Sequence, residues 1–110
     1  MWTRLILSLL LVVVLPLKTA AQTQITTGVI QGSVADATGA SLPGVTVEAR
    51  NIDTNQGRTQ VTETDGRFVC LQLAPGNYRV TCTLAGFATT VQENLQLTVG
   101  QAISLPMVMK

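Results

Sequence analysis

The chain contains no histidine among its 110 residues. Histidine is the most frequent general base, the central residue of Ser-His-Asp and Cys-His catalysis, and a common zinc ligand. Its absence excludes these arrangements, and a glycine-rich phosphate loop is missing as well. We therefore expect a protein that is not an enzyme and that carries no cofactor and no metal ion.

Aromatic and charged residues are also scarce, at 4% and 12% of the chain. Trp2 lies in the N-terminal segment, Phe68 and Tyr78 occupy expected core positions, and Phe87 ends an expected strand, so no aromatic platform is evident. After residue 21 the chain has five basic and six acidic residues, a formal charge of −1. Because nucleic-acid binding needs a basic patch, we expect no nucleic-acid partner.

A long hydrophobic run occurs only at the N-terminus. Leu5 to Leu15 is apolar apart from Ser8, follows Arg4 and precedes the small residues Thr19-Ala20-Ala21. The run is shorter than the roughly 20 residues that span a bilayer, and its flanks are typical of a secretory signal. We predict a cleaved signal peptide (1–21), a loose segment (22–27) and one domain (28–110). The mature chain would be exported, without a membrane span, to the periplasm or outer membrane.

Short alternating segments separated by turn residues fill the predicted domain. This pattern predicts an all-β sandwich with little or no helix. The seven expected strands are residues 29–35, 45–50, 58–64, 68–73, 78–84, 88–97 and 102–108. In the third of these, which is mostly polar and should lie at a sheet edge, Val61 is the expected inward anchor. Gly32 in the first strand indicates close packing or a bulge.

Cys70 and Cys82 lie on inward faces of their strands, on either side of the Pro75-Gly76 corner. In the oxidising compartment to which a signal peptide leads, they could form a disulfide. The alternative is two buried thiols that act as small hydrophobic side chains. Their spacing does not match a redox-active Cys-x-x-Cys motif.

The carboxylates Asp36, Asp53 and Asp65 fall in expected turns. Aspartate is common there because its side chain accepts hydrogen bonds from nearby backbone amides. A glycosidase-type carboxylate pair or a calcium site would need these residues to converge. Turn and surface roles are the simpler interpretation.

Eight short motifs occur in an order typical of one family. They are Gly32-Ser33-Val34-Ala35-Asp36, Thr38-Gly39, Leu42-Pro43-Gly44-Val45-Thr46-Val47, Asn51-x-x-Thr54, Thr64-Asp65-Gly66-Arg67-Phe68, Leu73-x-Pro75-Gly76-x-Tyr78-x-Val80, Gly86-Phe87 and Val99-Gly100-Gln101. From residue 28 to about 108 the chain resembles the carboxypeptidase regulatory-like domain. The resemblance implies a transthyretin-like, Greek-key β-sandwich in which Cys70 and Cys82 face each other from opposite sheets.

The same resemblance suggests a function. A signal peptide that leads directly into this module resembles the N-terminus of Oar-type TonB-dependent outer-membrane receptors. Since neither plug nor barrel follows before Lys110, the chain is either a fragment of such a receptor or a free-standing module. We expect a non-catalytic accessory module with a protein partner in an outer-membrane receptor system. The alternative is a carbohydrate-binding module, since the wider fold group includes such domains.

Overall fold

The computed structural model describes Val12 and residues 26–110. Apart from Val12, the predicted signal peptide (1–21) lies outside the described residues, as do residues 22–25 of the segment that follows it. Residues 26–110 contain seven strands and no helix, which confirms the predicted all-β class. The strands are β1 (Gly28–Asp36), β2 (Thr46–Asn51), β3 (Gly57–Val61), β4 (Arg67–Leu73), β5 (Gly76–Thr83), β6 (Thr90–Leu97) and β7 (Ala102–Met109).

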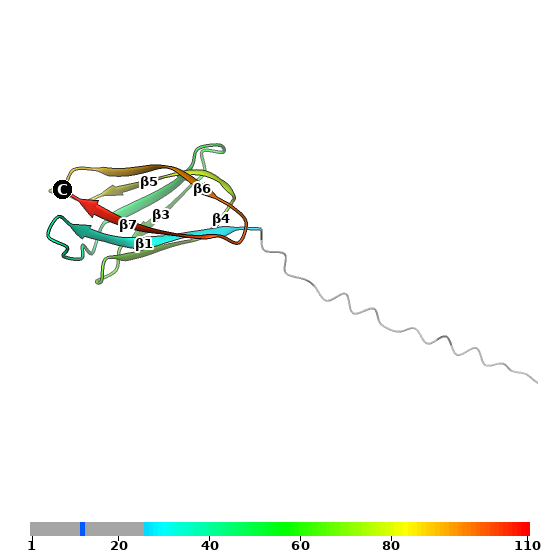
Figure 1. Cartoon of the computed structure of the whole chain (residues 1–110), viewed down its shortest axis with the longest axis horizontal. Helices are drawn as coiled ribbons and strands as arrows, with labels where there is room; N and C mark the ends of the chain where they lie inside the picture. The colour runs from blue at the N-terminus through cyan, green and yellow to red at the C-terminus, as the bar shows by residue number, and fades with distance from the viewer. Residues whose placement is uncertain (1–11, 13–25) are drawn as a thin grey trace, which may run out of the picture.

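The strands form two sheets packed as a sandwich (Figure 1). The three-stranded sheet has the order β4-β1-β7, and the four-stranded sheet has the order β3-β2-β5-β6. The first and last strands, β1 and β7, are parallel neighbours, and all other pairs are antiparallel. The strands that carry Phe68 and Tyr78 therefore belong to opposite sheets, as the family resemblance implied.

The core is built mainly from alternate residues of the strands other than β3, which is exposed throughout, since successive side chains of a strand point to opposite faces of its sheet. The buried hydrophobic residues are Ile30, Val34, Val45, Val47, Ala49, Phe68, Cys70, Leu73, Tyr78, Val80, Cys82, Leu97, Met107 and Met109. The hydroxyl of Tyr78 donates a 2.6 Å hydrogen bond to the carbonyl of Ala74, which fixes the corner before β5.

Gly32 lies in β1 against the backbone of β7. A Cβ atom at this position would lie 1.9 Å from the carbonyl oxygen of Leu105 and 3.0 Å from the ring of Phe68. Only glycine fits such a close backbone approach. The prediction of close packing at Gly32 is confirmed.

The prediction that Val61 points inward is wrong. Val61 pairs with Thr46 on β2, whose side chain faces solvent, and Val61 is 57% exposed. The buried residue is its neighbour Thr62, whose hydroxyl donates to the carbonyl of Leu42 at 2.7 Å and accepts from the amide of Val45 at 2.9 Å. Cross-strand register thus overrides the hydrophobicity of one residue, because partners across a ladder share a face.

Each sheet has two edge strands, β4 and β7 in one and β3 and β6 in the other. The polar third strand therefore lies at an edge, as predicted. Within the described part of the chain, no helix is long and apolar enough to cross a membrane.

Candidate interaction surfaces

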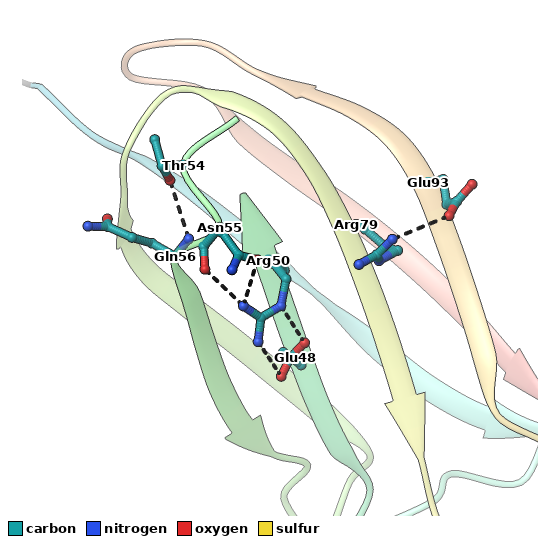
Figure 2. Close-up of polar contacts among 7 residues, drawn as sticks. All are labelled: Glu48, Arg50, Thr54, Asn55, Gln56, Arg79 and Glu93. Atoms are coloured by element: carbon teal, nitrogen blue, oxygen red, sulfur yellow. Dashed lines mark hydrogen bonds and ion pairs between the residues drawn. The ribbon is translucent and has the colours of Figure 1, made fainter. Parts of the chain in front are cut away.

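The solvent side of the four-stranded sheet carries paired charges among threonines, together with the exposed valines Val61 and Val91, and we call it the charged face. Its charged residues are Glu48 and Arg50 on β2, Arg79 on β5 and Glu93 on β6 (Figure 2). Both cross-strand neighbours of Glu48, Thr59 and Thr81, are threonines. The two carboxylates and two guanidinium groups on this face balance, so no charge of either sign is left in excess.

Arg50 is held from two directions on this face. Its Nε and Nη2 atoms donate to the two carboxylate oxygens of Glu48 at 3.1 and 3.2 Å. Its Nη1 donates to the backbone carbonyl and the side-chain oxygen of Asn55 at 2.8 and 3.2 Å (Figure 2). The hydrogen bonds to Glu48 raise the pKa of Arg50 above its ordinary value. Arg50 thereby fastens the loop between β2 and β3, a structural role.

Arg79 and Glu93 form the second pair of the charged face. Their closest nitrogen and oxygen atoms are 3.9 Å apart, and both side chains are exposed. A shallow hollow of about 140 Å³ beside them is also lined by Ile52, Asn77 and Asn94. This contact is too long for a hydrogen bond and leaves the guanidinium loosely held.

The solvent side of the three-stranded sheet differs, and we call it the apolar face. Val69, Leu71 and Val108 are 43%, 55% and 50% exposed there. The other outward residues of its strands are Val29, Gln31, Ser33, Ala35, Arg67, Ala102, Ser104 and Pro106. Arg67 is the only charged side chain among them. An exposed apolar area on a soluble domain is a common mark of an interaction surface.

A hollow of about 440 Å³ opens on the apolar face. Its lining includes Arg67 and Val69 from β4, Gln31 from β1 and Pro106 from β7. Arg67 is 75% exposed, and its Nε lies 3.8 Å from Asp65, so the guanidinium is weakly held. Ser33 and Ser104 also line it, so the hollow combines mixed polar and apolar walls with one available cation.

Sequence reasoning missed the apolar face, although the sequence carried a signal for it. The run Phe68-Val69-Cys70-Leu71 has no polar residue at alternate positions. A strand with one solvated face normally alternates apolar and polar residues. The uninterrupted run therefore already indicated that β4 is apolar on both sides.

Cys70 and Cys82 face the core from opposite sheets and are both free thiols with no exposed surface. Of the two alternatives, the structure has buried thiols and no disulfide. Burial raises the pKa of both, partly offset at Cys70 by the positive charge of Arg58, and brings the pKa of Cys82 to about 11.

The three turn aspartates do not converge on a site. Asp36 accepts hydrogen bonds from the hydroxyl of Thr38 at 2.6 Å and from the amides of Thr38 and Ala40. These bonds, that of the hydroxyl foremost, lower the pKa of Asp36. Asp65 accepts from the amide of Arg67, and Asp53 from the amide of Asn77. No group of three or more potential metal ligands occurs in the described residues.

The edge strands are poor templates for pairing with another chain. Pro106 lacks an N–H group on β7, and β3 is exposed along its whole length and carries the charged residue Arg58. Gln72 on β4 and Asn94 on β6 have positive φ angles of 56° and 60°, which disturb those edges. Such features discourage edge-to-edge association. The two faces are therefore stronger candidates for docking than the edges.

Residues 29–110 match the sequence profile of the carboxypeptidase regulatory-like domain, and the chain belongs to this family. A comparison with curated proteins gives no match. The family assignment confirms the resemblance that the ordered motifs indicated.

Solved structures share the fold. One similar chain comes from a type II cohesin–X-dockerin complex of Acetivibrio cellulolyticus, with 25% identity, a TM-score of 0.58, and coverage of 74% of this chain and 56% of that chain. A putative carbohydrate-binding protein from Pseudomonas aeruginosa has 17% identity and a TM-score of 0.56, with 81% and 92% of the two chains covered. The Bacillus anthracis TIE protein has 19% identity and a TM-score of 0.65, and the match covers 76% of this chain and 16% of that chain.

Proposed function

We propose that this protein is an exported, non-catalytic interaction module that docks through its apolar face onto a TonB-dependent outer-membrane receptor. The observation that carries the proposal is the contrast between the faces. The outward residues of the three-stranded sheet include one charge, Arg67, and three exposed aliphatic side chains, Val69, Leu71 and Val108. The centre of a protein interface is depleted in charge and enriched in apolar contact.

Export is supported by the sequence ahead of the domain. The apolar run from Leu5 to Leu15 and the small residues Thr19-Ala20-Ala21 are typical of a cleaved signal peptide. Intact-mass measurement of protein purified from the producing cell should give a chain that begins at Gln22. A chain that retains residues 1–21 would contradict the export hypothesis.

Docking is tested by photo-crosslinking in the exporting cell. A photoreactive amino acid replaces Val69 or Leu71 on the apolar face, and Thr59 or Thr81 on the charged face in matched controls. We expect receptor peptides to be crosslinked from Val69 and Leu71 and not from the threonines. Receptor crosslinks of equal yield from both faces, or crosslinks only to a second copy of this chain, would contradict the proposal.

Two further substitutions separate docking from folding. Val69→Lys and Leu71→Lys each place a charge at an exposed position, where substitutions usually change stability by less than about 0.5 kcal/mol. They should abolish the receptor crosslink from a reporter at Val108 while the unfolding midpoint stays unchanged. Thr59→Lys and Thr81→Lys should leave that crosslink intact.

A further inference from the structure

A polar hollow lies away from both faces, near the edges formed by β3 and β4. It measures about 350 Å³ and is lined by Thr27, Gln56, Gly57, Arg58, Gln72 and Ala74. This volume falls in the range of small-molecule sites, about 300–1,000 Å³. Its lining contains one cation, two primary amides and a hydroxyl, and no carboxylate or aromatic side chain.

Arg58 is the charged group of this hollow. The ion pairs in the described part of the chain are Glu48 with Arg50, Asp65 with Arg67, and Arg79 with Glu93, and Arg58 belongs to none of them. Its Nη2 donates a long hydrogen bond of 3.5 Å to the carbonyl of Gln72. A guanidinium has five N–H donors in a planar fork that matches a carboxylate. Most of these donors are therefore available to a ligand.

The backbone positions Arg58 over the hollow. Arg58 pairs with Ala49, whose side chain is fully buried, so Arg58 leaves β3 on the core side of the sheet. Its Nη2 lies 3.5 Å from the carbonyl of Gln72 on β4, so the side chain reaches across toward the other sheet. Arg58 thus lies at the edge of the gap between the sheets, where its side chain remains exposed to solvent and to a ligand.

Gln72 supplies an independent observation. It has a φ angle of 56° inside β4, a conformation that L-residues other than Gly, Asn and Asp rarely adopt. The strained residue turns its carbonyl toward Arg58 and lines the hollow. The pairing of β4 with β1 shifts register at this point, so the conformation belongs to a β-bulge, a feature common at sheet edges and beside active sites.

Gln56 approaches the hollow from the loop between β2 and β3. Its backbone is fixed, since its carbonyl accepts from the amide of Asn51 at 2.7 Å and its amide donates to the hydroxyl of Thr54 at 3.4 Å. Figure 2 shows its side chain extending away from the cluster of Arg50 and Glu48. Its amide group can both donate and accept a hydrogen bond.

We infer that this hollow binds a carboxylated sugar of the hexuronate class. The carboxylate of the sugar pairs with the guanidinium of Arg58 in a two-point contact. Its hydroxyl groups, which both donate and accept, meet the amides of Gln56 and Gln72 and the hydroxyl of Thr27. This site is separate from the apolar face and does not depend on the docking proposed above.

A titration of the protein with glucuronate, followed by ¹H–¹⁵N NMR, tests the assignment. We expect saturable shifts centred on Gln56, Arg58 and Gln72, with weaker binding at higher salt because a charge pair is involved. Glucose, which lacks the carboxylate, and acetate, which lacks the hydroxyls, should each bind at least about tenfold more weakly, the scale of a lost charge-assisted hydrogen bond. Acetate that binds as tightly as glucuronate would overturn the assignment to a sugar.

Matched variants locate the site. Arg58→Gln should weaken glucuronate binding by about tenfold or more, while Arg79→Gln on the charged face should leave it unchanged. Both are exposed arginines on strands of the same sheet, and the spectra of the variants report whether the fold is retained. Unchanged affinity in Arg58→Gln with a native spectrum, or shifts centred on Arg79, would overturn the proposal.

Discussion

The two faces of this sandwich use arginine in opposite ways. On the charged face Arg50 is saturated, with hydrogen bonds to both carboxylate oxygens of Glu48 and to Asn55. On the apolar face Arg67 is 75% exposed and has one ion-pair contact at 3.8 Å. The first residue serves the fold, and the second is available to a partner. The presence of a charged residue on a sheet therefore says little until its hydrogen bonds are known.

The sheets also differ in how closely their strands approach. In the three-stranded sheet Gly32 leaves no room for a side chain against Leu105. In the four-stranded sheet Gly57 lies at an exposed edge, and the nearest atom to an added Cβ is Nη2 of Arg50 at 3.4 Å, an ordinary contact distance. The two positions therefore differ sharply in how well they tolerate a side chain.

The largest expected change in the free energy of unfolding comes from substituting Gly32, with Gly57 as the comparison. Gly32→Ala forces a Cβ atom against the Leu105 carbonyl and should destabilise the domain by about 3 kcal/mol. Gly57→Ala should change the free energy of unfolding by less than about 0.5 kcal/mol. Urea denaturation of both variants measures the difference, and equal stabilities would show that β1 and β7 can separate at little cost.

The second effect concerns the two thiols between the sheets. Burial, and to a smaller extent the neighbouring Cys70, raises the pKa of Cys82 from 9.0 to about 11, so the folded state keeps the proton that the unfolded state loses. The stabilisation is complete below pH 9 and is lost as the pH rises toward 11, on the order of 1 kcal/mol. Thermal unfolding between pH 7 and 10.5 should show a smaller alkaline loss in Cys82→Ala than in the wild type.

Alkylation provides the control for the thiols. In native protein at pH 8, both cysteines should react slowly because the thiolate is the reactive form. After denaturation without reductant, mass spectrometry should find both alkylated. Labelling that requires a reductant would show a disulfide and would invalidate the pH argument.

The fold was predictable because its signals are local. Alternating apolar residues and the turns at Asp65-Gly66 and Pro75-Gly76 mark the strands, and each expected strand has a counterpart in the structure. The inward positions of Phe68, Tyr78 and Val80 follow from the same alternation. These features depend only on residues near one another in the sequence.

The surfaces were not predictable to the same degree. Whether Val61 or Thr62 enters the core depends on the pairing of β3 with β2, which local composition does not define. The hydrogen bond from Arg50 to the carbonyl of Asn55 depends on the conformation of the loop between β2 and β3. Properties that arise from register or loop geometry need the folded structure, and the binding properties of the faces belong to that class.

The third effect compares the arginines directly. Arg50→Ala removes hydrogen bonds to Glu48 and to the loop carbonyl of Asn55, and should cost about 1 kcal/mol. Arg67→Ala removes an exposed contact and should cost less than about 0.5 kcal/mol. Urea denaturation at one salt concentration gives both values. An equal cost would mean that Arg67 also supports the fold, which would weaken its assignment to docking.

The smallest expected effect comes from comparing the strengths of the two ion pairs on the charged face. A double-mutant cycle with Arg79→Ala and Glu93→Ala should give a coupling below about 0.5 kcal/mol that disappears in 1 M salt, where the Debye length is about 3 Å. The cycle for Arg50 and Glu48 should give a larger coupling that salt reduces less, because two hydrogen bonds join those groups at 3.1 and 3.2 Å. Salt-sensitive couplings of equal size would mean that the whole charged face is held only by screened surface charge. If the coupling between Arg50 and Glu48 is the larger, the firmly held part of the charged face is the region around the loop that Arg50 fastens. Arg79 is then held as weakly as Arg67.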